Sequence, residues 1–529
     1  MSKQKYTGSF ITLMFLIVLT AALILVNFIA AELPPLRLDL TSGAQYSLSD
    51  ATRKIIGSLA DRVKVDVYFT RDLPSPYNRH AAYVRDLLEE YSTYARGNLA
   101  YEFIDPGTDE AKKREVVMKG IPAVQIQEIK NDQIGIKQVF MGIVVTYGTK
   151  QEAIPLVRRT EDLEYALTGS IKKLTAPGLK TVAFAKGHGE PAIDEKMRRL
   201  KGELEKNYRV VTQDFNSTKD IPADVTTLVV VAPSQKWSDE DIFHLDQFIM
   251  RGGTAAFLLS SVQVDIHQFT GAEDVDNGLH DVLASYGITP EKNLVVDPNC
   301  GMINVETQQG SYRIRNIISY PYIPLITDLN RDHVLTKDIG KITFPFLSSL
   351  TLASNRPGLN YTALARTSNK SWQESGTYNL NPMERKTRPQ NVVDGPFNAA
   401  AIASGKFPGF FAKETGEGRP DFIKDPAKVL KESPETRILV VGTGYFGQDE
   451  FADEGGMIFL INAIDWLAQD SDMITIRSRG LSERPISDLQ PLTKQCLRYA
   501  NMLGVPLLFV IFGIVRWQLR KAKLRNFKL

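Results

Sequence analysis

Short apolar runs alternate with runs of helical spacing through the central part of the chain. Residues 181–185, 226–232 and 255–259 are largely apolar, and each run is followed by polar residues and a turn. After the first run, apolar side chains recur three or four positions apart, at Ile193, Met197, Leu200 and Leu204. Strands that alternate with helices in this way predict a parallel sheet covered on both faces.

A second helix is predicted just before the run 255–259. Ser238-Asp239-Glu240-Asp241 has the pattern of a capping box, and an apolar face follows at Ile242, Leu245 and Ile249. The turn Gly187-His188-Gly189-Glu190 comes shortly after the first strand. It is therefore expected at the carboxyl end of the sheet, where open α/β sheets bind ligands.

The amino-terminal third has a different order of elements. A strand at 63–69, a helix, a strand at 99–104 and a polar helix are followed by a strand opening at 120–124, which we expect to pair with 142–147 as a hairpin. This order, with an X-Pro before the third strand, resembles a thioredoxin-like fold. The redox site of that fold would fall at 70–75, where there is no cysteine. Thiol chemistry needs a thiolate, so a scaffold or binding role remains.

These patterns divide the chain into four parts. Residues 1–33 hold a tail and a membrane anchor, and 34–177 form the thioredoxin-like domain without a CxxC motif. Residues 178–490 form a parallel-sheet domain with a mixed insertion at about 265–434, after which the strand at 437–442 and the helix at 457–467 rejoin the sheet. Residues 491–529 hold a second membrane helix and a basic tail. The predicted fold class is α/β, flanked by one transmembrane helix at each end.

The two ends carry the membrane signal. Gly8 to Ala31 has no charge and is long enough to span a bilayer, and a signal peptide is the competing interpretation. Tyr499 to Val515 is apolar apart from Asn501, and a buried core helix is its alternative. Basic residues precede the first segment and follow the second. The positive-inside rule then places both termini in the cytoplasm and the body outside.

Charge and cysteine content exclude other classes of protein. The formal net charge is +2, from 63 basic and 61 acidic residues. Without the eight basic residues that flank the spans the body is mildly acidic, which gives no support to nucleic-acid binding. Cys300 and Cys496 are the only cysteines, so no disulfide framework is available.

Four groups of residues, taken in order, resemble the gliding-motility-associated ABC transporter auxiliary proteins (GldG-like). They are Arg37-x-Asp39-Leu40-Thr41 with Tyr46-Ser47-Leu48-Ser49; Gly187-His188-Gly189-Glu190; Leu364-Ala365-Arg366-Thr367-Ser368 with Ser371-Trp372; and Asn462-Ala463-x-Asp465-Trp466-Leu467 with Ile476-Arg477-Ser478-Arg479.

The resemblance implies a subunit anchored in the bacterial cytoplasmic membrane that works with an ABC permease and its cytoplasmic ATPase. Its central domain is similar to a degenerate class I glutamine amidotransferase. We expect a non-enzymatic auxiliary or substrate-binding subunit without a cofactor, with its body in the periplasm. A membrane-bound hydrolase acting on cell-envelope material and a purely structural envelope anchor are the alternatives. No phosphate-binding GxxxxGK[ST] motif occurs, so the chain is not the ATPase of its own system.

The turn Gly187–Glu190 allows two interpretations. With Ala192 it fits the dinucleotide pattern GxGxxA, but Glu190 would place a carboxylate where a pyrophosphate binds. What remains is either a tight turn shaped by Gly187 and Gly189, or a site in which His188 and Glu190 hold a cationic or hydroxyl-rich ligand.

Catalytic and metal sites find little support. An amidotransferase-like nucleophile would sit at Ser260 or Ser261, but neither lies in a GxSxG motif, and the sequence does not place His267 or His280 as a base. The group Asp265, His267, Asp274, Asp276 and His280 matches no zinc spacing and is expected to form a solvated loop. Cys300 is expected to be a small, partly buried residue.

The second apolar segment also carries small and polar residues. Gly504 and Gly513 permit close helix packing, and Asn501 needs a polar partner in lipid. We therefore expect this helix to pack against the permease.

The topology is the first testable expectation. Reporter fusions should place both termini in the cytoplasm and a residue such as Gln390 outside, because the basic flanks stay on the cytoplasmic side. An external carboxyl terminus would remove the second span and make Tyr499–Val515 a core helix.

Overall fold

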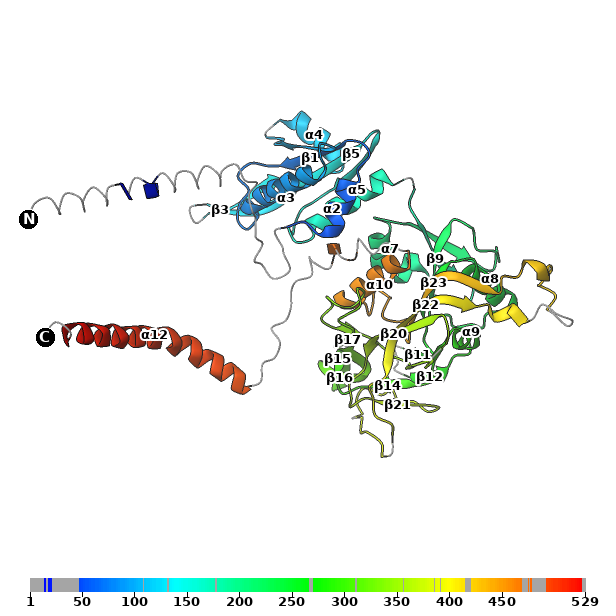
Figure 1. Cartoon of the computed structure of the whole chain (residues 1–529). Coiled ribbons are helices and arrows are strands. Elements are labelled where there is room, and N and C mark those ends of the chain that lie inside the picture. The colour runs from blue at the N-terminus through cyan, green and yellow to red at the C-terminus, as the bar shows by residue number, and fades with distance from the viewer. Residues whose placement is uncertain are drawn as a thin grey trace, which may run out of the picture. The chain divides into compact units, whose positions relative to one another are not determined.

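Figure 1 shows the computed structural model of the chain. It describes residues 14–15, 18–20, 47–107, 109–130, 133–176, 178–265, 270–309, 312–354, 356–384, 386–390, 392–413, 420–468, 474, 476–477 and 491–525. Most of the predicted first span and the signature residues before Ser47 lie outside these ranges. The folded body belongs to one unit, Met1–Gly480, and the last helix to another, Leu481–Leu529.

The first domain is built around a four-stranded sheet in the order β2-β1-β5-β6. Strand β1 (Val63–Phe69) runs parallel to β2 (Leu99–Ile104) and antiparallel to β5 (Met141–Tyr147), which pairs with β6 (Lys150–Ile154). Apolar side chains of the sheet form one core with those of three helices, namely α2 (Asp50–Gly57), α3 (His80–Tyr94) and α5 (Leu163–Thr175). The short helices η1 (Tyr77–Arg79) and α4 (Glu110–Met118) complete the domain.

The predicted hairpin of this domain is wrong in its pairing. Strand β3 (Val124–Lys130) pairs with β4 (Gln133–Val139) in a separate two-stranded sheet, and β5 lies between β1 and β6 instead. The pattern explains the difference: residues 141–145 are continuously apolar and buried, whereas β3 alternates apolar and polar residues. A continuously apolar strand belongs inside a sheet that is covered on both faces.

The second domain contains a ten-stranded sheet, whose main path runs β13-β19-β22-β23-β10-β9-β7-β8. Its parallel part consists of β7 (Thr181–Lys186), β8 (Arg209–Asp214), β9 (Val225–Val231), β10 (Thr254–Leu258) and β23 (Glu432–Val441). Strand β23 returns from far along the chain to lie parallel to β10. Its buried residues 438–441 place it in the middle of the sheet.

Helices cover both faces of this sheet. Helices α6 (Ile193–Lys196), α7 (Arg198–Leu204) and α10 (Glu454–Leu467) share a core with one face. Helices α8 (Asp239–Met250) and α9 (Leu279–Ser285) share a core with the other, as Figure 1 shows. The chain leaves helical geometry at Met197, with φ −136°, so the helix predicted from 193 to 204 is two helices with one buried face.

The middle stretch, 265–434, contributes to the main sheet as well as to smaller ones. Antiparallel strands extend the sheet on its β23 side: β13 (Ile288–Pro290), β17 (Asp328–Leu329), β19 (Leu350–Leu352), β20 (Leu359–Arg366) and β22 (Asn398–Pro408). The smaller sheets use β11 (Val262–Asp265), β12 (Thr270–Asp274), β14 (Leu294–Val296), β15 (Cys300–Gln309), β16 (Tyr312–Ile326), β18 (Ile342–Thr343) and β21 (Trp372–Glu374). Two short helices, η2 (Phe410–Lys413) and η3 (Pro426–Lys428), lie before β23.

The last helix, α12 (Pro491–Arg525), contains the segment Tyr499–Val515. Within the described residues, no helix combines the length and the apolar character needed to cross a membrane.

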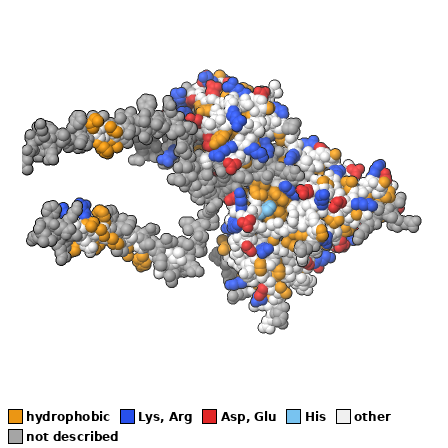
Figure 2. Space-filling model, in the orientation of Figure 1, with side chains coloured by type: hydrophobic (Ala, Val, Ile, Leu, Met, Phe, Trp, Pro, Cys, Tyr) orange, Lys and Arg blue, Asp and Glu red, His pale blue; other side chains and the backbone are white. Residues whose placement is uncertain are grey.

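Basic and acidic side chains lie side by side over the face of the body shown in Figure 2. This mixture agrees with the nearly balanced charge of the sequence.

Candidate functional site

The turn after β7 is held open by two glycines and tied to the next loop. Gly187 has φ +130° and Gly189 has φ +78°, backbone conformations that side chains with a Cβ rarely adopt. A Cβ at Gly189 would also lie 2.1 Å from Ser234 Oγ. The carbonyl oxygen of His188 accepts hydrogen bonds from the backbone N–H groups of Ser234 and Gln235, at 3.0 and 2.9 Å. The turn is therefore fastened to the loop after β9.

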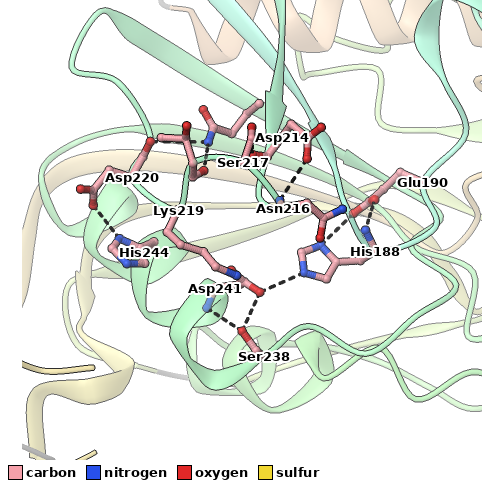
Figure 3. Close-up of polar contacts among 12 residues, drawn as sticks. His188, Glu190, Asp214, Asn216, Ser217, Lys219, Asp220, Ser238, Asp241 and His244 are labelled. Carbon is pink, nitrogen blue, oxygen red and sulfur yellow. Dashed lines mark hydrogen bonds and ion pairs between the residues drawn. The ribbon is translucent and has the colours of Figure 1, made fainter. Parts of the chain in front are cut away.

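The His188 side chain lies between two carboxylates, as Figure 3 shows. Its Nε2 is 3.1 Å from Asp241 Oδ2, a hydrogen bond, and its Nδ1 is 3.4 Å from Glu190 Oε1. The second contact is an ion pair rather than a hydrogen bond, because both of its atoms lack a hydrogen-bond partner. The imidazole ring stacks on Trp237 with ring centroids 4.3 Å apart.

Asp241 connects this cluster to helix α8. Ser238 caps the helix by accepting from the Asp241 backbone N–H at 3.2 Å, and its hydroxyl donates to Asp241 Oδ2 at 2.6 Å. Lys219 Nζ donates to Asp241 Oδ1 at 2.6 Å. The capping role of Ser238, predicted from the sequence, is confirmed.

Burial and pairing act in opposite directions on His188. Burial alone lowers the pKa of the imidazole, but its contacts with the nearby carboxylates of Glu190 and Asp241 outweigh burial and raise the pKa above the ordinary 6.5. The pKa of Asp241 is lowered, because Lys219, Ser238 and His188 outweigh the effect of burial. With His188 protonated, its charge and that of Lys219 balance Glu190 and Asp241.

The His188 imidazole and its two carboxylates are closed to solvent, whereas the Lys219 side chain is 39% exposed. The side chains of His188, Glu190 and Asp241 are 8%, 1% and 3% exposed. Buried charges are stable only when they are paired, and here each charge has its partner inside the protein. This arrangement favours the turn as architecture over the turn as a ligand site. The decisive partners Asp241, Lys219 and Trp237 were not predicted, because they come from elements far along the chain.

Several other described residues that carry the family resemblance are also paired internally. Ser368 donates both its backbone N–H and its hydroxyl to the carboxylate of Asp297, at 2.8 and 2.7 Å. The backbone N–H of Ser49 donates to Glu164 Oε1 at 2.8 Å, and Arg477 pairs with Asp465 at 2.7 Å. Polar residues that look like a functional signature in the sequence thus join distant parts of the fold.

Ser261 and His280 meet at the carboxyl end of β10. Ser261 Oγ lies 3.3 Å from His280 Nε2, and burial lowers the pKa of His280, so the ring is neutral at neutral pH. This is the first half of a catalytic triad. However, Ser261 is 0% exposed, and among the described residues the buried His280 Nδ1 has no hydrogen-bond partner that would orient the ring. The pair therefore lacks both access and an orienting acid.

The other candidate residues named from the sequence belong neither to the His188 cluster nor to the Ser261–His280 pair. Ser260 accepts from the backbone N–H of Gly444 at 3.0 Å, and Cys300 is partly buried, which raises the pKa of its thiol. Among the described residues no group of His, Cys, Asp and Glu has the arrangement of a metal site, and His267 lies outside them.

Gly504 and Gly513 lie in α12, where a Cβ at either position would meet no described atom within 4 Å. Asn501 is in the same helix. Packing of this face against a permease stays a prediction.

Comparison with known families identifies the second domain. The model for auxiliary proteins of the family described as "ABC-type uncharacterized transport system" matches residues 179–466, which is more than half of the chain. The chain belongs to this family. A second model, for a domain of unknown function, matches residues 42–146. The expected assignment to an ABC transport system is confirmed at this level.

Two individual proteins are similar to this chain over different lengths. An uncharacterized protein of Borreliella burgdorferi is 23% identical over 520 residues, covering 96% of this chain and 97% of its own. The mmIFT52 N-terminal domain is 13% identical, with a TM-score of 0.33, and covers 54% of this chain and 97% of its own. The first likeness extends over both domains.

The raised pKa of His188 predicts that the stability of the protein depends on pH. Because the folded state holds this proton more tightly than the unfolded state, the contacts contribute stability that is fully present below about pH 6.5 and is lost as pH rises through the raised pKa. The thermal midpoint of the wild type, measured relative to His188→Gln, should therefore fall as pH rises above about 6.5.

His333 provides the control, because burial lowers its pKa. In the same comparison with His333→Gln, the wild type should gain relative stability as pH rises through the lowered pKa towards about 6.5 and should then stay level above that pH. A wild-type advantage over His188→Gln that does not depend on pH would contradict the ion cluster.

Because Ser261 is buried, we expect that the Ser261–His280 pair does not act in catalysis. Ser261→Ala and His280→Gln should each leave cellular function intact when protein abundance is normal, as should Ser260→Ala and Cys300→Ala. Complementation of a deletion strain together with immunoblotting measures both quantities. Loss of function at normal abundance in both the Ser261 and His280 variants would support a hydrolase instead.

Proposed function

We propose that the chain is a non-catalytic, membrane-anchored subunit of an ABC transport system, with its body outside the cytoplasmic membrane. The family match over residues 179–466 carries the proposal. The uncharged segment Gly8–Ala31 and the apolar segment Tyr499–Val515, each with basic flanks, support one membrane tether at each end. An ABC permease and its cytoplasmic ATPase are the proposed partners.

The connection between the body and the last helix supports a mechanical role. Arg477 is the last described residue before α12 begins at Pro491. Its guanidinium pairs with Asp465 at 2.7 Å and donates to Asn462 Oδ1 at 2.5 Å, both on α10 of the second domain.

The same side chain reaches the first domain. The Arg477 guanidinium lies over the ring of Tyr165 on α5, 4.5 Å from its centroid, and donates to the Tyr165 hydroxyl. Ile476 packs against Ala51 of α2. A displacement of the carboxyl-terminal tether would therefore act on both domains at one point. In the proposed mechanism, ATP-driven motion of the permease changes the body through this connection.

The internal pairing of the signature residues supports a non-catalytic role. The cluster at His188 is closed, and the Ser261–His280 pair lacks access and an orienting acid. The Ser261–His280 contact is also the one observation that favours an amidotransferase-like hydrolase, which we keep as the second candidate. The resemblance to gliding-motility proteins extends the proposal to surface motility in organisms that glide.

Co-purification tests the proposal. The full-length chain, tagged and isolated from detergent-solubilised native membranes, should recover an ABC permease and an ATPase, identified by mass spectrometry. Replacing residues 499–515 by an unrelated span of equal length should keep the chain in the membrane but lose the permease, because packing depends on Asn501, Gly504 and Gly513.

The control is an equally tagged, unrelated protein with two membrane spans. Recovery of no transport component above that control would overturn the proposed partnership. An unchanged complex after the replacement would show that the helix is an anchor only.

A further inference from the structure

A cavity of about 700 Å³ lies within the first domain, at the carboxyl ends of the parallel strands β1 and β2. The loop 70–74 after β1, the amino-terminal half of α3 and the end of β2 line it. Its volume is in the range of small-molecule sites in proteins, roughly 300–1,000 Å³. The loop is the one that would carry the redox site in a thioredoxin-like fold, and it contains no cysteine.

Hydrogen bonds from other strands hold this loop in place. Thr70 and Phe140 exchange two hydrogen bonds, from the Thr70 backbone N–H to the Phe140 carbonyl at 3.0 Å and from the Phe140 N–H to the Thr70 hydroxyl at 2.9 Å. Lys137 Nζ donates to the carbonyl oxygen of Asp72 at 2.8 Å, where φ is +53°. Leu73 is buried in the core. The cavity is therefore preformed, which lowers the cost of ordering when a ligand binds.

Two of the charged side chains in the wall are already paired. Arg71 lies 3.6 Å from Asp105, and Asp105 also accepts from the backbone N–H of Gly107 at 2.9 Å. This pair leaves no net charge at its side of the cavity.

The two other charged side chains have no ionic partner among the described residues. The guanidinium of Arg85 lies over the ring of Phe103, 4.8 Å from its centroid, which orients it without neutralising it. The carboxylate of Asp72 makes no ion pair or hydrogen bond with any described residue. The cavity thus presents one uncommitted positive charge and one uncommitted negative charge, with Leu73, Pro74 and Phe103 as apolar wall.

We propose that this cavity binds a zwitterionic ligand of the peptide class, a short peptide or a free amino acid. The ligand carboxylate would pair with Arg85, its ammonium group with Asp72, and an apolar side chain would rest on the wall of Leu73, Pro74 and Phe103. Guanidinium and carboxylate groups form strong, directional hydrogen bonds. A phosphate dianion fits less well, because beside the one uncommitted cation, Arg85, it would meet the uncommitted carboxylate of Asp72.

Isothermal titration of the purified full-length chain tests this assignment. The probes are the tripeptides Ala-Leu-Ala, Ala-Phe-Ala, Ala-Asp-Ala and Ala-Lys-Ala, their N-acetylated and C-amidated forms, and inorganic phosphate. At least one free tripeptide should bind saturably, and blocking either terminus should weaken binding by about tenfold or more, since a charged hydrogen bond is lost. Phosphate should bind more weakly than the tripeptide.

Two variants test which residue binds each end of the ligand. Arg85→Gln should weaken binding of the free tripeptide by about tenfold and remove the preference for a free carboxylate. Asp72→Asn should remove the preference for a free amino group, and asparagine tolerates the positive φ at this position. Arg313→Gln and Asp328→Asn change exposed residues of the second domain and should leave binding unchanged.

If Arg85→Gln fails to fold, Arg85→Lys tests the same contact. This variant keeps the positive charge and should retain most of the affinity. Absence of heat with every tripeptide up to millimolar concentration would overturn the assignment and make the cavity a packing gap. So would equal binding of free and blocked peptides, or tighter binding of phosphate. Binding is measured on the chain alone, so its result is separate from co-purification with transport proteins.

Discussion

The large sheet of the second domain has to keep both of its faces away from water. Side chains such as Val230 and Leu258 on neighbouring strands are fully buried, one in the core with α8 and the other in the core with α10. Strands of this kind are mostly apolar, and buried polar side chains along them, such as Thr227 and Thr254, are hydrogen-bonded to each other. Polar and charged residues are therefore concentrated at the strand ends and in the loops that follow. Each candidate site discussed above in the second domain is at such a position.

The charges at these ends are stable because they are paired. His188 with Asp241, Ser368 with Asp297, and Arg477 with Asp465 each join elements far apart in the sequence. Removing one partner of a buried pair typically destabilises a protein by about 3–5 kcal/mol, because the other charge stays buried alone. Replacement of both partners together has a much smaller effect. Residues that look like a functional signature in the sequence can therefore serve the fold itself, whereas in the cavity of the first domain two charges have no ionic partner among the described residues.

Much of the second domain could be predicted from the sequence, and the reasons are local. The apolar runs of β7, β9 and β10 and the Ser238 cap of α8 depend on neighbouring residues, so periodicity and capping rules find them.

Pairing between distant segments could not be predicted in the same way. The place of β5 beside β1, the contact between Ser261 and His280, and the enclosure of His188 by Asp241 all depend on tertiary packing. A hydrophobic pattern predicts that a segment is buried, but it does not identify its neighbours. For that reason the sequence allowed two interpretations of the turn at His188, architecture or ligand site. The burial of the carboxylates of Glu190 and Asp241 beside His188 favours architecture.

The Arg477 contacts also bear on where the structural domain ends. The region shared with the family stops at residue 466, directly after Asp465 and Trp466. A fragment cut there would keep Asp465 in the interior, with its carboxylate hydrogen-bonded by Tyr208 at 2.6 Å, but would lose the guanidinium that neutralises it. In a fragment that also keeps the first domain, the ring of Tyr165 would lose the guanidinium that covers it. The smallest autonomous piece of the second domain thus reaches at least to Arg477, and a recombinant fragment that stops where the family match stops would have an incomplete fold.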